Sequence, residues 1–340
     1  MTVRVDERWS YSGLPLVRLE NAALAADVLP SLGGKILHLV DKAADRNVLW
    51  RHPRILPHPA PLQANTDDHF SGGWDDAFPT GAPSRNRWGD VLPYLGEVWT
   101  LPLRATVEVA GPRRARLALE GLTPITPARW VRFIELEGDE PILTLRTSIE
   151  NIGYLPFDFN WGSHPSLSVD PGFRIDVPAS SGRVDDAGGR VLGEVGDTYA
   201  YPILRADSGN PLDVRRVLPP EAGAYALHIL EGLQDGWVAA TDTRWKRGFG
   251  VVFDHHTHRA VWQWMVYGGF RGWYHVILEP WVAGPPALED AVSRGEARTL
   301  APGEVFEATM RGILYSGVAG VSHLAEDGSV RGAKSLKERS

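Results

Sequence analysis

The sequence predicts an all-β protein in which two large antiparallel sheets pack face to face. Three observations favour this fold class. The 340 residues include 36 glycines and 26 prolines, and short runs of alternating apolar and polar residues lie between these turn-forming positions. Only one segment of the sequence has helical character. The 13 tryptophans are typical of a large β core, although an indole face can also stack on a sugar ring.

The first part of the chain contains strand patterns and one irregular segment. Residues 16–30, "LVRLENAALAADVLP", divide into two apolar runs around Glu20-Asn21, which predicts a hairpin. A further strand is expected in "GGKILHLVD", which begins at Gly33-Gly34. Residues 51–93 are rich in Pro, Gly, Asn, Asp, His and Trp and show no clear period. A structureless segment of this length is usually functional, so we expect it to contribute to a site.

The rest of the chain is a series of strand patterns with one helix. The alternating runs are "LRATVEVAG", "RARLALEG", "ARWVRFIELEG", "PILTLRTSIENIG", "GFRIDVP", "YALHILEG", "GWVAATDTR", "FGVVFDHH", "RAVWQWMVYGG", "GWYHVILEPW" and "LAPGEVFEATMRGILYSG". The segment "PALEDAVSRGEART" has a proline near its start and acids in its first turn, which predicts a helix. We therefore expect one β-sandwich domain with a binding cleft over residues 1–317, followed by a flexible polar tail over residues 318–340.

The composition argues against several kinds of site and partner. Cysteine is absent, so disulfides, thiolate metal sites and cysteine nucleophiles are excluded. The net charge is −7 without a basic block, which argues against nucleic acid as a partner. The opening "MTVRVDERWS" lacks the apolar run of a signal peptide, and no apolar stretch approaches the ~20 residues that span a bilayer. We therefore expect a cytoplasmic protein without a membrane partner.

The segment "DDHFSGGWDDAFPTGAPSRNRW", residues 67–88, combines acids, tryptophans, arginines and one histidine around Gly72-Gly73. Paired glycines let a backbone bend where a ligand approaches closely. Asp75 and Asp76 cannot both point the same way in an extended chain, so one is expected to face a site and the other to cap or turn the loop. The acids and His69 also permit metal binding, but no ligand spacing is diagnostic, and a solvated turn is the alternative.

Two further stretches carry groups suited to acid–base chemistry. In "NWGSHP", Gly162 permits a turn, and the proline after His164 favours extended geometry, which places the histidine at a strand end. In "HVILEPW", Glu279 ends an apolar strand-like run. Burial of a carboxylate is costly unless it is paired or used, and it raises the pKa toward values that suit a general base. The alternatives are a packed structural histidine and a buried ion pair with an arginine.

The stretch "FDHHTHRAVWQWM" places three histidines near Asp254. Zinc needs ligands that converge from facing positions, whereas these residues lie between two predicted strands. Solvated histidines in a hairpin loop are therefore the favoured interpretation, and we expect neither a metal nor another cofactor. The chain has no G-x-S-x-G elbow, P-loop or G-x-G-x-x-G motif, which argues against serine hydrolysis, nucleotide hydrolysis and dinucleotide redox chemistry.

Four motifs in order, "GGWDDAFP", "NWGSHP", "LEPW" and "LAPGE", resemble the aldose 1-epimerase (galactose mutarotase-like) superfamily, in particular its divergent bacterial branch. The resemblance covers roughly residues 16–317. It implies a large antiparallel β-supersandwich and an isomerase that interconverts the anomers of a free hexose or hexose derivative. The implied partner is a small-molecule sugar, bound by a monomer or homodimer.

The resemblance also assigns roles to individual residues. His164, followed by proline, matches the general acid of the family, and Glu279 in "LEP" matches its general base. Glu279 would take the proton of the C1 hydroxyl while His164 protonates the ring oxygen, so that the ring opens and can close to the other anomer. The residues expected to stack on the sugar or hydrogen-bond to it are His69, Trp74, Asp75, Asp76, Arg85, Arg87, Trp161 and Trp281.

One position departs from the family pattern. The family carries a second active-site histidine in a His-Gly motif, whereas this chain reads "LGEVW", with Leu95 in that place. A leucine cannot donate a hydrogen bond to a sugar oxygen, and His69 is a candidate replacement. Two main alternatives remain open: a carbohydrate-binding protein without catalysis, and an epimerase of phosphorylated or sulfonated sugars held by Arg85, Arg87 and Arg271. A glycan lyase or hydrolase on the same fold is a minor alternative, since the paired acids Asp75 and Asp76 alone do not define one.

Overall fold

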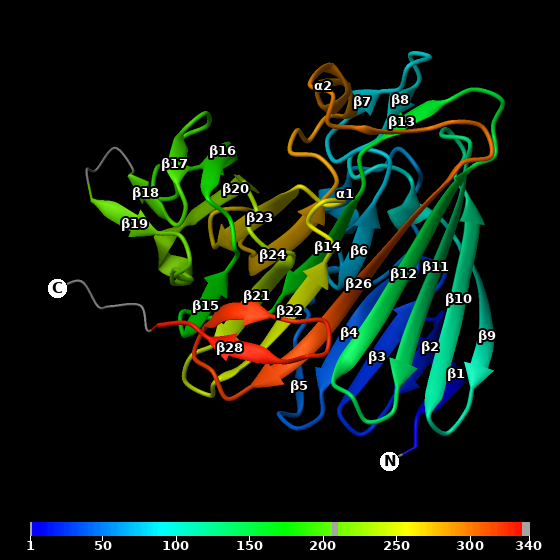
Figure 1. Cartoon of the computed structure of the whole chain (residues 1–340), viewed down its shortest axis with the longest axis horizontal. Helices are drawn as coiled ribbons and strands as arrows, with labels where there is room; N and C mark the ends of the chain where they lie inside the picture. Colours follow the sequence, from blue (N-terminus) through cyan, green and yellow to red (C-terminus); the bar gives the residue numbers. More distant parts are fainter. Residues whose placement is uncertain (1, 206–209, 335–340) are drawn as a thin grey trace. The chain divides into compact units, whose positions relative to one another are not determined.

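Figure 1 shows the computed structural model, which describes residues 2–205 and 210–334. Strands dominate it, and the helices among these residues are two short α-helices and two 3₁₀ turns. The chain divides into two compact units: one contains Met1–Ser166 and Glu279–Met310, and the other contains Leu167–Leu278 and Arg311–Ser340. No helix in the described ranges is long and apolar enough to cross a membrane.

The first unit holds two large antiparallel sheets. In one of them the strand order is β1-β2-β3-β4-β6-β14, with β5 paired to β4, and in the other it is β9-β10-β11-β12. The bounds in the first sheet are β1 Arg4–Tyr11, β2 Leu14–Glu20, β3 Leu24–Leu29, β4 Lys35–Asp41, β5 Arg46–Asn47, β6 Trp74–Ala77 and β14 Gly162–Leu167. Those in the second are β9 Arg104–Ala110, β10 Arg114–Leu122, β11 Ala128–Glu137 and β12 Ile142–Asn151.

Shorter elements complete this unit. The strand pairs are β7 with β8 and β13 with β25. The bounds are α1 Thr66–His69, β7 Ser84–Arg85, β8 Val91–Leu92, η1 Val98–Thr100, β13 Phe157–Phe159, α2 Leu288–Ser293 and β25 Arg298–Leu300.

The strands of the two sheets of the first unit appear in Figure 1 in blue for β1–β4 and in cyan to green for β9–β12. Along β10, buried residues alternate with partly exposed ones, as expected for a strand with one face in the core. Gly34 has φ +72°, and a Cβ there would lie 2.7 Å from Leu119 Cδ1 of β10. The positive φ favours glycine at this position, and a larger residue would also displace the Leu119 side chain. The predicted packing of two antiparallel sheets is confirmed in this unit.

The second unit is also built from antiparallel strands. The neighbours are β17-β16-β20-β23-β24 in one group and β15-β21-β22-β26 in another, with the separate pairs β18–β19 and β27–β28. The bounds are β15 Phe173–Asp176, β16 Ser181–Gly188, β17 Thr198–Ala200, β18 Ile203–Arg205, β19 Pro211–Asp213, η2 Pro220–Ala222, β20 Ala224–Glu231, β21 Trp237–Asp242, β22 Arg247–Phe253, β23 Ala260–Tyr267, β24 Tyr274–Trp281, β26 Val305–Ser316, β27 Val321–Leu324 and β28 Val330–Gly332.

The boundaries between the units fall inside strands β14, β24 and β26. Separate domains are normally joined by exposed, flexible linkers, and the chain changes unit within strands instead. We therefore retain a single domain over residues 1–317 as a proposal.

Most of the predicted elements are confirmed. Strands β2 and β3 form the hairpin expected in residues 16–30, β4 begins directly after Gly33-Gly34, and α2 lies in the segment predicted to be helical. Residues 51–93 differ from the expectation of a structureless segment, because they contain α1 and the inner strand β6. All four residues of β6 are buried, and a strand buried on both faces shows no alternation in sequence.

Residues 318–334 differ from the predicted flexible tail. Strands β27 and β28 pair as an antiparallel hairpin. Val321 and Leu324 of β27 are 2% and 1% exposed, so two apolar side chains anchor an otherwise polar segment. Residues 335–340 of the predicted tail lie outside the described residues.

Candidate functional site

The candidate site lies on β6, on the part of the neighbouring strand β14 up to Ser166, and on the last residues of β24 from Glu279, and all of these residues belong to the first unit. In the antiparallel register of β6 and β14, Asp75 lies opposite His164. Residues directly opposite each other leave the same face of a sheet. Asp76 faces the other way, because side chains alternate along a strand. The sheet thus separates the two adjacent acids.

His164 and Glu279, the residues predicted to act as acid and base, lie side by side. Their Nε2 and Oε1 atoms are 3.8 Å apart, and their side chains are 8% and 3% exposed. Trp281 donates its indole N–H to Glu279 Oε2 at 2.9 Å, which leaves Oε1 as the oxygen nearer the histidine. Within the described ranges, His164 Nδ1 is buried without a hydrogen-bond partner.

Burial shifts both groups toward their uncharged forms. It lowers the pKa of His164 to about 3, and the positive charge of Lys35 adds to this shift. Burial raises the pKa of Glu279 to about 8, against the hydrogen bond from Trp281. Between these two values the pair holds one proton in total. That is the number a coupled acid–base step needs, since one group must donate while the other accepts.

A buried ion pair lies beside His164. Lys35 Nζ, at the start of β4, is 2.6 Å from Asp75 Oδ2, and the two side chains are 5% and 7% exposed. The same ammonium donates to the carbonyl oxygen of Gly72 at 2.9 Å. The other carboxylate oxygen, Asp75 Oδ1, is buried and has no partner in the described part of the chain. Burial raises the pKa of Asp75, and the charge of Lys35 opposes that shift.

The ring of Phe70 contacts both His164 and Lys35 of the ion pair. Its ring meets the His164 ring edge-on, with centroids 5.5 Å apart, and Lys35 Nζ lies 5.5 Å from its centroid, within cation–π range. Trp50 stacks on Phe70 with centroids 5.9 Å apart. An apolar wall of this kind strengthens the electrostatic interactions of the groups beside it. Neither Lys35 nor Phe70 was predicted to belong to the site.

The second acid of β6, Asp76, belongs to the core between the sheets. It forms an ion pair with Arg132 of β11, and its Oδ1 accepts from Arg132 Nη2 at 2.6 Å and from Trp161 Nε1 at 3.0 Å. Arg132 also donates to Thr147 Oγ1. The sequence predicted that one of the two acids faces a site and that the other caps or turns the loop. Asp76 does neither, because it pairs with a buried arginine.

The three tryptophans predicted to stack on a sugar are core residues. Trp74, Trp161 and Trp281 are 1%, 0% and 0% exposed. Trp74 donates its indole N–H to Ser163 Oγ at 2.7 Å, and the other two donate to the acids described above. Their rings pack among other buried residues, and their N–H groups orient the side chains that accept from them.

The remaining predicted residues have partners elsewhere. His69 Nδ1 is 2.8 Å from Nε2 of His58. Arg85 donates to a carbonyl oxygen of its own loop at 2.6 Å, and Arg87 pairs with Asp158 at 2.9 Å. None of these contacts joins the three residues to the acid–base pair.

Leu95 is a packed apolar residue. It is 7% exposed, and its φ of 57° is uncommon for a residue other than glycine. Its backbone N–H donates to the carbonyl oxygen of Gly81 at 2.8 Å. The leucine side chain has no hydrogen-bond donor, so a donor to a sugar oxygen has to come from another residue.

The turn between β22 and β23, in the second unit, carries the histidine-rich stretch. One ligand atom from each of Asp254, His255 and His256 lies within 4.8 Å of the others, so these side chains could hold a metal ion. The carboxylate also accepts from the backbone N–H of His256 at 3.0 Å and from the hydroxyl of Thr257 at 2.7 Å, as turn-capping acids do. His258 is 0% exposed, contrary to the solvated histidine expected there.

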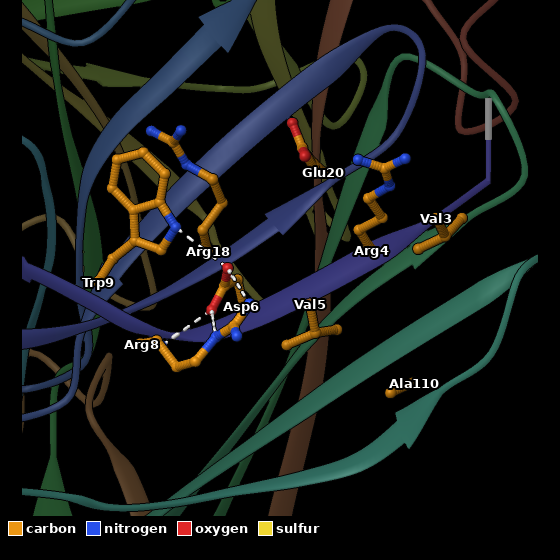
Figure 2. A pocket seen from close by; sticks show the side chains of 9 residues that line it. All are labelled: Val3, Arg4, Val5, Asp6, Arg8, Trp9, Arg18, Glu20 and Ala110. Atoms are coloured by element: carbon orange, nitrogen blue, oxygen red, sulfur yellow. Dashed lines mark hydrogen bonds and ion pairs between the residues drawn. The ribbon is translucent and has the colours of Figure 1, made fainter.

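A hollow of about 530 Å³ lies at the outer strands β1 and β2 of the first unit. Figure 2 shows Trp9 and Arg18 lining it, with the guanidinium 4.4 Å from the indole centroid. Asp6 accepts hydrogen bonds from Arg8 and Trp9, and these bonds, with that of Arg8 foremost, hold its pKa at about 2. None of the predicted site residues lines this hollow.

Solved structures identify the fold. A galactose mutarotase-like protein from Clostridium acetobutylicum matches with a TM-score of 0.65 at 13% identity, covering 93% of this chain and 99% of that one. The chain has the galactose mutarotase-like fold. A candidate aldose 1-epimerase from Escherichia coli K12 matches with a TM-score of 0.64 at 16% identity, over 88% of this chain and 99% of the other. The Slr1438 protein from Synechocystis sp. PCC 6803 gives 0.67 at 17% identity, over 91% and 99%.

Neither a protein-family model nor a curated protein matches the sequence. At 13–17% identity the structural likeness concerns the mutarotase-like fold alone. That fold agrees with the β-supersandwich that the four sequence motifs implied. The reaction has to be argued from the residues of the site.

Proposed function

We propose that the protein is an aldose 1-epimerase-like isomerase that interconverts the α and β anomers of a free hexose or hexose derivative. The observation that carries the proposal is the buried contact between His164 and Glu279, 3.8 Å apart. A buried acid and base with perturbed pKa values are characteristic of catalytic sites. The mutarotase-like fold, shared with proteins named as aldose 1-epimerases and mutarotases, supports this class of reaction.

Opening a sugar ring requires one proton to arrive and one to leave. The C1 hydroxyl loses its proton to one group, the ring oxygen gains a proton from the other, and the bond between C1 and the ring oxygen breaks to leave an aldehyde. Rotation about the C1–C2 bond presents the other face of the carbonyl, and ring closure returns both protons. A pair that holds one proton is therefore restored after each turnover.

The family resemblance makes His164 the acid and Glu279 the base. Burial favours the uncharged arrangement, with the proton on Glu279. The two arrangements contain the same number of protons and differ by one transfer between neighbouring atoms. The mechanism depends on that total, and sugar hydroxyls that solvate the charged arrangement bring it closer in free energy.

Sugar binding without catalysis is the second candidate function. Leu95 favours it, because the histidine that the family pattern places there is absent. A protein of this kind would bind hexoses and leave the exchange of anomers at its spontaneous rate.

The third candidate function is an epimerase of anionic sugars, but the arginines expected to hold the anionic group have other partners. Arg87 is paired with Asp158, and Arg85 is used within its own loop. Arg271, in the second unit, lies over the rings of Phe270 and Trp273. We therefore favour an uncharged sugar.

NMR exchange spectroscopy on D-glucose and D-galactose tests the proposal. The wild-type protein should raise the rate of anomer exchange above the spontaneous rate, in proportion to its concentration. His164→Ala and Glu279→Gln should each lower this acceleration by about 10²- to 10⁴-fold, the usual contribution of a general acid or base. Glu289→Gln, which changes an exposed carboxylate of α2, is the matched control and should keep the full rate.

Wild-type rates in both site variants would refute the role assignment. Hexose binding to the wild-type protein, measured by tryptophan fluorescence, without any acceleration of exchange would support the second candidate function instead.

A further inference from the structure

Three buried polar groups, Lys35, Asp75 and His164, keep hydrogen-bonding capacity that the described residues do not use. An ammonium has three N–H donors, and Lys35 uses two of them, on Asp75 Oδ2 and on the Gly72 carbonyl oxygen. Asp75 Oδ1 is a buried acceptor without a partner, and His164 Nδ1 is a buried nitrogen without one. Buried polar atoms are nearly always paired in folded proteins, so exceptions require an explanation.

These unused atoms are gathered in one place. Asp75 and His164 lie opposite each other on β6 and β14, and Lys35 is 2.6 Å from Asp75. Lys35 and His164 both contact the ring of Phe70. Glu279 contacts His164, so the free donor and the free acceptor lie beside the acid–base pair.

We propose that Lys35 and Asp75 form a substrate-binding pair that holds two neighbouring hydroxyl groups of the sugar beside His164. Lys35 donates its remaining N–H to one hydroxyl oxygen, and Asp75 Oδ1 accepts from the adjacent hydroxyl. The inference rests on the proposed function and narrows its substrate class to uncharged sugars with a vicinal diol next to the reacting carbons. Asp75 neutralises the charge of Lys35, so no net positive charge remains for a phosphate or sulfonate.

The pair differs from a structural ion pair in the same unit. Asp76 and Arg132 are equally buried, and their hydrogen bonds extend to Trp161 and Thr147. If Lys35 and Asp75 served only the fold, the same saturation would be expected. The remaining N–H of Lys35 also provides a hydrogen-bond donor for a sugar oxygen, which the leucine at position 95 cannot provide.

A panel of D-glucose and its monodeoxy derivatives tests the pair. Calorimetry measures the affinity of each sugar for wild-type protein, Lys35→Met and Asp75→Asn, and NMR exchange measures the rate. Lys35→Met should weaken D-glucose binding by about 10- to 100-fold, because a hydrogen bond to a charged donor is lost. It should also remove the discrimination against one deoxy sugar that the wild-type protein shows. Asp75→Asn should do the same for the neighbouring hydroxyl.

The controls separate binding from damage to the fold. Lys42→Met changes a lysine that forms a partly exposed ion pair with Glu20, and it should leave affinity and rate unchanged. The double variant Lys35→Met/Asp75→Asn leaves no unpaired buried charge and should fold while showing both losses. His164 provides a readout that needs no sugar: because the charge of Lys35 lowers its pKa, Lys35→Met should let the histidine protonate at higher pH in NMR titrations.

Equal loss on every sugar of the panel, no loss on any, or no sugar binding to the wild-type protein would overturn the inference. Binding that shows the paired pattern of losses, without any acceleration of anomer exchange, would uphold the inference and refute the proposed function.

Discussion

Asp75 and Asp76 are adjacent on one strand, and their surroundings differ. Asp76 faces the space between the two sheets, where Arg132 and Trp161 donate to it. Asp75 faces His164, and one of its carboxylate oxygens has no partner within the described ranges. Both acids are buried and each has one cationic partner. What distinguishes them is whether their hydrogen bonds are complete.

Complete and incomplete buried hydrogen-bond networks contribute differently to a protein. A complete buried network stabilises the fold, because no polar atom is left without a partner. An incomplete one costs free energy that the fold does not recover, and a bound ligand that completes it is one explanation for its retention. By this criterion Asp76 and Arg132 hold the sheets together, whereas we propose Lys35, Asp75, His164 and Glu279 as the site.

The largest difference is expected in stability. Asp76→Asn leaves Arg132 buried without its counter-charge, and an arginine cannot deprotonate, so the free energy of unfolding should fall by about 3–5 kcal/mol. Asp75→Asn should cost on the order of 1–3 kcal/mol, because the amide oxygen can still accept a hydrogen bond from the Lys35 ammonium. Urea unfolding followed by circular dichroism measures both values. Equal losses would contradict the distinction between the two acids.

A smaller effect is expected from Gly162→Ala, which acts on the site through Trp281. A Cβ at Gly162 would lie 2.1 Å from Trp281 Cε2, so the indole that donates to Glu279 has to move. Overpacking of this kind costs about 1–3 kcal/mol. The variant should lose stability and lose anomer exchange as well, because the hydrogen bond to Glu279 is disturbed. Gly89→Ala is the control, since a Cβ there meets nothing within 4 Å, although its φ of +89° adds local strain. Full exchange activity in Gly162→Ala would show that the position of Trp281 does not matter.

The smallest expected effect concerns the dependence of anomer exchange on pH. Glu279 keeps the proton of the pair below its pKa of about 8 and loses it above, so kcat/KM should fall by about tenfold per pH unit above that value. At the acid end, His164 gains a second proton only near pH 3. Trp281→Phe removes the hydrogen bond that opposes the raised pKa of Glu279, so the alkaline limb should move to higher pH. A limb that stays in place would assign it to another group.

Site residues that lie in short sequence motifs were predicted from the sequence, whereas those outside such motifs were missed. His164 and Glu279 lie in "NWGSHP" and "LEPW", and the structure brings them together. Arg132 was missed although a signal exists: alternation along β11 places it on the buried face with Trp130 and Ile134. Lys35 gives no such signal, because β4 is buried on both faces at its start. Its partner lies 40 residues away in the chain.

Tryptophan shows the limit of composition as a guide. Trp74, Trp161 and Trp281 stand beside acids or at motif ends, and that placement predicted sugar stacking. In the structure they are core residues whose N–H groups bind polar side chains. Sequence neighbours on a strand face opposite sides, so proximity to an acid in sequence does not place a ring in the site.

The crystal structure of the protein with D-glucose bound tests the central claim most directly. We expect the C1 hydroxyl and the ring oxygen to lie within hydrogen-bond distance of Glu279 and His164, and two neighbouring hydroxyls to contact Lys35 and Asp75. A sugar bound only elsewhere, such as in the hollow beside Trp9 (Figure 2), would contradict the account.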